Sequence, residues 1–262
     1  MKTPLKQSYF LFFIFTTIFT LFVNFQILAK PIITRHDVPD NKYVLLADKY
    51  SETKALFLVN KTDVAGTLIN PQFILTAAHV ANDIKVGDSL ISHNQKYKIS
   101  EILIHPEWNE DESKDLALIK LNQQVENIMP IPLYNKLDEL HKKVLIIGNG
   151  DKGTGVTGPI GNDGQFRAAT NRIVEASENW LKWDFIDPRV DSSGVTEMEG
   201  IAGPGDSGGP AFIYINGKAF LAGISGGQST RNTKGREGVY GVREFYVRIS
   251  NYLNWINSML SN

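Results

Sequence analysis

The segment GDSGGP at residues 205–210 sets a serine among glycines, late in a chain of 262 residues. Glycines on both sides of Ser207 let the backbone turn tightly and leave the hydroxyl exposed. Backbone N–H groups near such a turn can converge on one point, as an oxyanion hole requires. An ordinary glycine-rich turn also explains the segment. The segment therefore predicts a nucleophilic serine only if the chain also supplies a base and an acid that orients this base.

Two earlier segments supply those groups. LTAAH at residues 75–79 ends an apolar run with His79, and DLALIKL at residues 115–121 opens another apolar run with Asp115. Taken singly, His79 could be a core histidine and Asp115 could cap a strand. A serine needs a base to accept its proton, and that base needs a carboxylate to orient it. The three segments together therefore predict a catalytic triad of Ser207, His79 and Asp115.

The rest of the chain predicts an all-β fold with a C-terminal helix. Short apolar runs, such as residues 55–59, 73–76 and 211–215, alternate with turn signals. Asn216-Gly217 lies between two such runs and predicts a hairpin turn. Near the end of the chain, apolar residues follow helical spacing over 249–260. This pattern is compatible with barrels or with a sandwich.

Composition excludes several classes of protein. The chain has no cysteine, which excludes a thiol nucleophile, a thiolate metal site and a disulfide scaffold. The formal net charge is -1 and no extended basic face appears, so we expect no nucleic-acid partner. The sequence contains no evident metal-ligand cluster, and we expect neither a metal site nor a cofactor.

Two motif matches are set aside. Residues 205–209 also fit G-x-S-x-G, the nucleophile elbow of α/β-hydrolases, but that fold has its histidine after the serine. Every histidine here precedes Ser207. Residues 148–153 fit G-x-G-x-x-G, but the glycine- and proline-rich segment that follows does not predict the helix that a dinucleotide site needs.

The first 29 residues are typical of a secretory signal peptide. Lys2 and Lys6 precede an uncharged run over residues 9–25, and Ala29 offers a small residue for cleavage. An uncleaved membrane anchor over residues 10–28 is the alternative. With cleavage, we expect a secreted protein, extracellular or periplasmic, without stable membrane association.

The three catalytic segments resemble those of the chymotrypsin/trypsin-like serine peptidase family. The order His79, Asp115, Ser207 is the family's order, and the TAAH and GDSGGP strings are its most specific signatures. The resemblance extends over residues 36–260. It implies two six-stranded antiparallel barrels, at about 36–135 and 142–248, followed by a C-terminal helix at 249–260. The peptidase domain would be 36–262, with residues 30–35 a possible propeptide or N-terminal segment.

The resemblance also implies the role of each residue. Ser207 would attack the peptide carbonyl of a protein or peptide substrate, His79 would relay the proton, and Asp115 would orient His79. The N–H groups of Gly205 and Ser207 would bind the oxyanion. A catalytically inert relative that binds partners is the alternative function.

Specificity is predicted by counting back from the serine. The family's pocket base lies six residues before Ser207, at Ile201, which predicts an uncharged, apolar preference before the scissile bond. A shift of two residues would put Glu199 there and restore a basic preference. The expected substrate-binding residues are Ile201, Ala202, Ser225, Gly227 and Gly238.

Asp206 departs from the family pattern in its expected partner. In many relatives, a new N-terminal amine pairs with the aspartate that precedes the serine. Residues 32–37 read IITRHD here rather than the usual terminus. An internal cation such as Arg35 is an alternative partner for Asp206.

Overall fold

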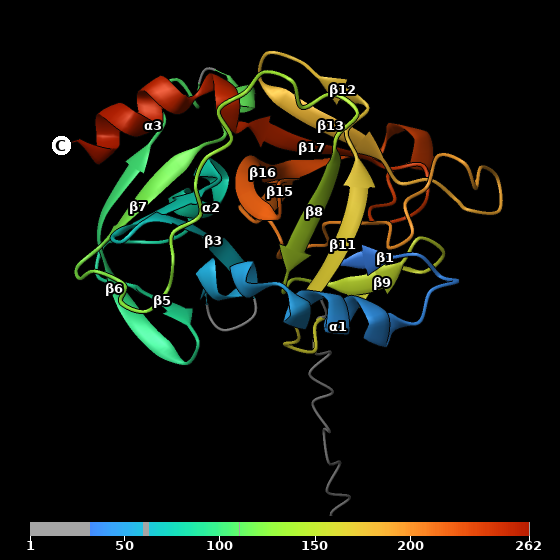
Figure 1. Cartoon of the computed structure of the whole chain (residues 1–262), viewed down its shortest axis with the longest axis horizontal. Helices are drawn as coiled ribbons and strands as arrows, with labels where there is room; N and C mark the ends of the chain where they lie inside the picture. The colour runs from blue at the N-terminus through green and yellow to red at the C-terminus, as the bar shows by residue number, and fades with distance from the viewer. Residues whose placement is uncertain (1–31, 60–62, 110, 262) are drawn as a thin grey trace, which may run out of the picture.

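The computed structural model describes residues 32–59, 63–109 and 111–261, and the first half of this part is a closed barrel. The six antiparallel strands follow the order β2-β3-β4-β7-β6-β5 around the barrel (Figure 1). The strands are β2 (Leu56–Val59), β3 (Asp63–Asn70), β4 (Phe73–Thr76), β5 (Ser89–Ser92), β6 (Gln95–Ile104) and β7 (Ala117–Leu121). A short helix, α2 (Ala78–Asn82), follows β4 directly.

The second half is built on a curled seven-stranded sheet. Its strand order is β11-β8-β15-β16-β17-β13-β12, and every neighbouring pair is antiparallel. The β15–β16 hairpin turns at Asn216-Gly217, both with positive φ, as the sequence predicts. The strands are β8 (Lys143–Gly148), β11 (Arg167–Arg172), β12 (Glu175–Ala176), β13 (Trp180–Asp184), β15 (Pro210–Ile215), β16 (Lys218–Ser229) and β17 (Arg243–Arg248).

A small sheet of order β10-β9-β1-β14 ties the start of the described chain to the second half. Its strands are β1 (Ile33–Thr34), β9 (Lys152–Thr154), β10 (Gly158–Gly161) and β14 (Gly200–Ile201). Ile32 and Ile33 are almost fully buried, and Ile33 pairs with Ile201. Residues 32–34, which the sequence leaves outside the predicted domain, are thus packed inside the fold.

Two longer helices pack on the strands. Helix α1 (Asp40–Lys49) contacts β11, and helix α3 (Leu253–Leu260) lies beside the first barrel although it follows the second half (Figure 1). One hydrophobic cluster includes Leu75 of the first barrel, Phe212 of the second half and Ile256 of α3. The 3₁₀ helices are Ser51–Ala55, Glu112–Lys114, Arg231–Thr233 and Ile249–Asn251.

The predicted fold class, all-β with two antiparallel barrels and a C-terminal helix, is confirmed, with the second barrel present as the curled sheet. The predicted signal peptide at 1–29 lies outside the described residues. In the described part of the chain, none of the helices has the length and apolar character to cross a bilayer.

Candidate active site

His79 and Asp115 are brought together by the pairing of β4 with β7. Thr76 at the end of β4 pairs with Ala117 at the start of β7. His79 comes just after Thr76, and Asp115 comes just before Ala117. Because the strands are antiparallel, the end of one meets the start of the other. The apolar runs on either side of these residues therefore fix the position of both side chains.

Two hydrogen bonds join the pair. His79 Nδ1 lies 2.6 Å from Asp115 Oδ2, and the backbone N–H of His79 donates to Asp115 Oδ1 at 2.8 Å. The Asp115 side chain is 7% exposed, whereas that of His79 is 38% exposed. The buried carboxylate can hold the ring in one orientation and leave Nε2 open to a partner in the cleft.

Ser207 faces the same space as His79. A cavity of about 360 Å³ is lined by both residues, together with Asp63 and Gly205. Ser207 lies between β14 and β15, and the backbone bond from Gly208 N–H to the Ser225 carbonyl, at 2.9 Å, holds the turn against β16. The described residues show no hydrogen bond between the Ser207 hydroxyl and His79. Such bonds often tighten only when substrate is present.

Two backbone donors lie at the serine turn. Within the described parts of the chain, the N–H groups of Gly205 and Ser207 donate to no other protein group. Gly205 has φ +88°, a conformation that favours glycine. A Cβ added there would also lie 2.7 Å from an Asp63 carboxylate oxygen. Any side chain at position 205 would disturb the turn that presents the two N–H groups.

Asp206 is buried behind this turn and accepts bonds from several backbone N–H groups. Its donors include Ile32 at 3.2 Å, Gly150 at 2.6 Å and Gly203 at 2.9 Å. Burial raises the pKa of Asp206 to about 6, although these donors oppose the rise. The hypothesis that Arg35 pairs with Asp206 is wrong. Arg35 instead binds Asp37 and the carbonyl of Thr196.

Ser207 also lines a second cavity. Its volume is about 130 Å³, and three of the expected substrate-binding residues line it: Ala202, Ser225 and Gly227. Gly238 does not line it, and a Cβ at that position would meet Pro159 at 2.9 Å and Ile33 at 3.1 Å. Its neighbour Glu237 lines the cavity instead.

The expectation of which residue lies at the bottom of this cavity requires correction. Ile201 is fully buried in the hydrophobic cluster of the second half, where β14 pairs with β1, and it does not line the cavity. The alternative, Glu199, accepts hydrogen bonds from the N–H groups of Ile186 and Thr196 and does not line it either. Both side chains are engaged elsewhere, since β14 carries this segment away from the cavity.

The residue that sequence reasoning missed is Glu244. It lies in β17, is fully buried and lines the cavity beside Ser207. Alternation along this strand predicts that residues 244, 246 and 248 share one face, and all three are buried. A glutamate on the inward face of a strand is the signal that could have identified it.

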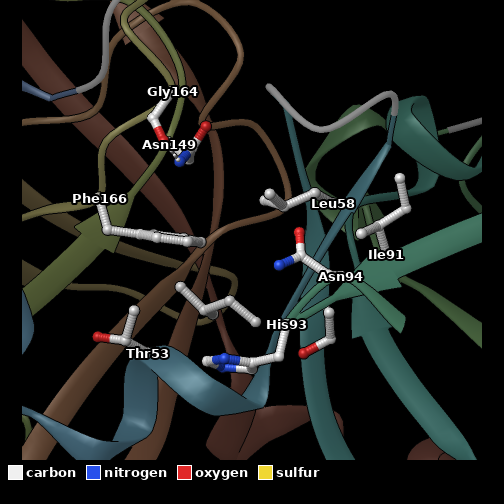
Figure 2. Close-up of a pocket in the computed structure, with 10 residues that line it drawn as sticks. Thr53, Leu58, Ile91, His93, Asn94, Asn149, Gly164 and Phe166 are labelled. Atoms are coloured by element: carbon white, nitrogen blue, oxygen red, sulfur yellow. Dashed lines mark hydrogen bonds between the residues drawn. The ribbon is translucent and has the colours of Figure 1, made fainter. Parts of the chain in front are cut away.

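A further cavity lies between the two halves, away from the serine. Figure 2 shows Phe166 of the second half on one side of it, and Leu58 of β2 and Asn94 on the other side. Its volume is about 200 Å³. Neither Ser207 nor His79 lines it. Asn149 at its edge is buried and donates a hydrogen bond to the Gly164 carbonyl. Ser92 and His93 also line this cavity, but the Ser92 hydroxyl donates to the Lys54 carbonyl at 3.2 Å, and no hydrogen bond among the described residues joins it to His93.

Known proteins match both the sequence and the fold. A family model described as Trypsin matches residues 48–256. Chymotrypsin-like elastase family member 1 of Homo sapiens is 27% identical over 218 residues, covering 75% of this chain and 81% of that protein. Granzyme B of Rattus norvegicus is 26% identical over 249 residues, covering 88% of each.

Other matches differ in length or show the fold alone. Vitamin K-dependent protein C of Mus musculus is 26% identical over 243 residues, covering 80% of this chain and 49% of that protein. The chain thus spans about half the length of this relative. The structure of neuropsin, described as a serine protease expressed in the limbic system of mouse brain, superposes with a TM-score of 0.58 at 21% identity. The match covers 87% of this chain and 98% of neuropsin.

Proposed function

We propose, from the premise that this chain belongs to the trypsin family of serine endopeptidases, that it hydrolyses peptide bonds with Ser207, His79 and Asp115. The observation that carries the proposal is the pairing of His79 with a buried carboxylate, at 2.6 Å, on the wall of the cavity that Ser207 also lines. A histidine oriented in this way can accept the proton of a serine hydroxyl.

The reaction follows from these groups. The hydroxyl oxygen of Ser207 attacks the carbonyl carbon of the substrate while His79 Nε2 accepts its proton. The carbonyl oxygen becomes an oxyanion, which the N–H groups of Gly205 and Ser207 stabilise. His79 then protonates the leaving amine, and an acyl group remains on Ser207. A water molecule, activated by His79, releases the acid and restores the hydroxyl. Throughout, Asp115 stabilises the charged form of the imidazole.

We further propose that the enzyme acts outside the cytoplasm. The charged, apolar and cleavable order of residues 1–29 supports this proposal. Its substrates would be extracellular or periplasmic proteins and peptides. Sequencing the N-terminus of the protein recovered from the medium tests it, and recovery of an intact residue 1 in the membrane fraction would contradict it.

The central test is removal of the nucleophile. Ser207→Ala is expected to lower casein hydrolysis by about 10³–10⁶-fold and to leave the fold intact. A fluorescent serine-reactive phosphonate should label the unmodified protein and not this variant. Ser258→Ala, which removes an exposed hydroxyl on α3, is the matched control. Unchanged hydrolysis in Ser207→Ala would refute the assignment. A protein that neither hydrolyses peptides nor reacts with the phosphonate would favour the inert binding function.

A further inference from the structure

The cavity beside Ser207 contains a buried acid with an unsatisfied oxygen. Glu244 Oε2 accepts a hydrogen bond from the Ala202 N–H at 3.4 Å, and the Gln228 side chain bonds the same carboxyl group. Glu244 Oε1 is buried and has no hydrogen-bond partner among the described residues. A buried acceptor without a donor is unfavourable, so native proteins nearly always satisfy it with a donor, a water or a ligand.

The charges around this cavity are of one sign. Of its lining residues, Glu237 and Glu244 are acidic and none is basic. Behind Glu244 lie the carboxyl of Asp206 and the phenol of Tyr246, which add no positive charge. Arg243 precedes Glu244 on β17 but is bound to Asp184 at 2.7 Å. Glu244 therefore has no cation from its own chain in the described structure.

The cavity is also open to a long side chain. Gly227 has φ +147°, and a Cβ added there would meet nothing within 4 Å. Ser225 and Gly227 flank a bulge in the pairing of β16 with β17, and both line the cavity beside Ser207, where a substrate segment can lie along β16. Such a segment, with its carbonyl at Ser207, would direct the side chain before the scissile bond toward Glu244.

We propose that Glu244 selects substrates with lysine or arginine immediately before the scissile bond. This rests on the proposed function and replaces the apolar preference expected from Ile201. An ammonium or guanidinium group supplies the missing donor to Oε1 and neutralises the buried acid in one contact. A phenylalanine or leucine side chain would leave Oε1 without a donor.

Burial raises the pKa of Glu244 well above its ordinary value. The carboxyl must lose its proton to pair with a cation, so cleavage after lysine should increase as pH rises through that pKa. Cleavage after leucine should lack this dependence, since its contact with Glu244 needs no charge. The ratio of the two rates removes any pH dependence of the catalytic steps that both reactions share.

The test is a peptide panel in which only the residue before the cleaved bond changes, among Arg, Lys, Gln, Phe and Leu. We expect kcat/KM for Arg and Lys to exceed that for Phe and Leu by about 10²-fold or more. Glu244→Gln should remove most of this ratio. Glu199→Gln, which changes a buried glutamate outside the cavity, should preserve it. A preference for Phe or Leu in the unmodified enzyme, or a ratio unaffected by Glu244→Gln, would overturn the proposal.

Two measurements keep this test separate from the proposed function. Phosphonate labelling of Ser207 reports an active serine whatever the specificity, so a labelled enzyme that prefers Phe contradicts only the role of Glu244. If Glu244→Gln does not fold, a competition experiment on the unmodified enzyme takes the place of the variant. It measures whether a small cation protects Ser207 from reaction with the phosphonate. Benzamidine should protect at concentrations at which neutral benzamide does not. Equal protection by the two compounds would contradict the proposal.

Discussion

Glu199 should make the stability of the protein depend on pH. The side chain is fully buried, and burial raises its pKa from 4.5 to about 7, against the two backbone N–H donors that favour the charged form. The folded protein thus binds this proton more tightly than the unfolded chain. The contribution of Glu199 to stability is complete below pH 4.5 and is lost as pH rises through 7. The full difference corresponds to about 3 kcal/mol.

The measurement compares this protein with Glu199→Gln in urea, both carrying Ser207→Ala to prevent self-digestion. Glutamine stays neutral at every pH, so any cost of placing its amide beside two N–H donors is constant. Between pH 5 and pH 8, the unfolding free energy of the protein with Glu199 should fall by about 2–3 kcal/mol relative to the variant. Fluorescence of the buried Trp183 reports unfolding.

The comparison removes contributions from other groups. Asp206 and Glu244 also have raised pKa values and change stability in the same direction, whereas burial lowers the pKa of His105, which acts oppositely. All three are present in both proteins and cancel in the difference. Glu237→Gln, at an exposed position, should reproduce the parent profile. Parallel profiles with and without Glu199 would refute the reasoning.

Two further predictions concern the triad and the core. Asp115→Asn should lower kcat by about 10⁴-fold with little change in KM, because an amide cannot hold the imidazole in the required tautomer; a loss below tenfold in peptide kinetics would contradict this role. Arg248→Met should lower the unfolding free energy in urea by about 3–5 kcal/mol, since it leaves Glu139 buried without its two-point partner. Adding Glu139→Leu should recover much of that loss. If the loss of unfolding free energy in the double variant equals the sum of the losses in the two single variants, the two residues do not interact as proposed.

The fold and the candidate triad could be predicted because their signals are local. An apolar run that ends at His79 and another that begins at Asp115 require only one antiparallel pairing to bring the two side chains together. The signal from the glycines around Ser207 is also local, because the turn that they permit depends on the backbone of a few adjacent residues. Asn216-Gly217 likewise specifies its hairpin without reference to the rest of the chain.

The specificity cavity could not be predicted by counting residues along the chain. The distance in sequence from Ser207 to a pocket residue is fixed only if the segment between them keeps one conformation. Here that segment contains β14, whose pairing with β1 turns Ile201 into the hydrophobic cluster. The acid that lines the cavity comes from β17. It could be recognised only from the alternation that puts a charged residue on the inward face of that strand.

The segment at residues 32–34 shows why long-range contacts escape sequence analysis. Ile32 and Ile33 are a short apolar pair without a turn signal or a periodic pattern, and nothing local distinguishes them from a linker. Their place is set by residues far along the chain: Ile33 pairs with Ile201, and the Ile32 N–H donates to Asp206, 174 positions away. Gly150 and Gly203 donate to the same carboxyl group. Because Asp206 is adjacent to Ser207, the orientation of the serine turn depends on two distant segments, at Ile32 and Gly150, that only the folded structure brings to it.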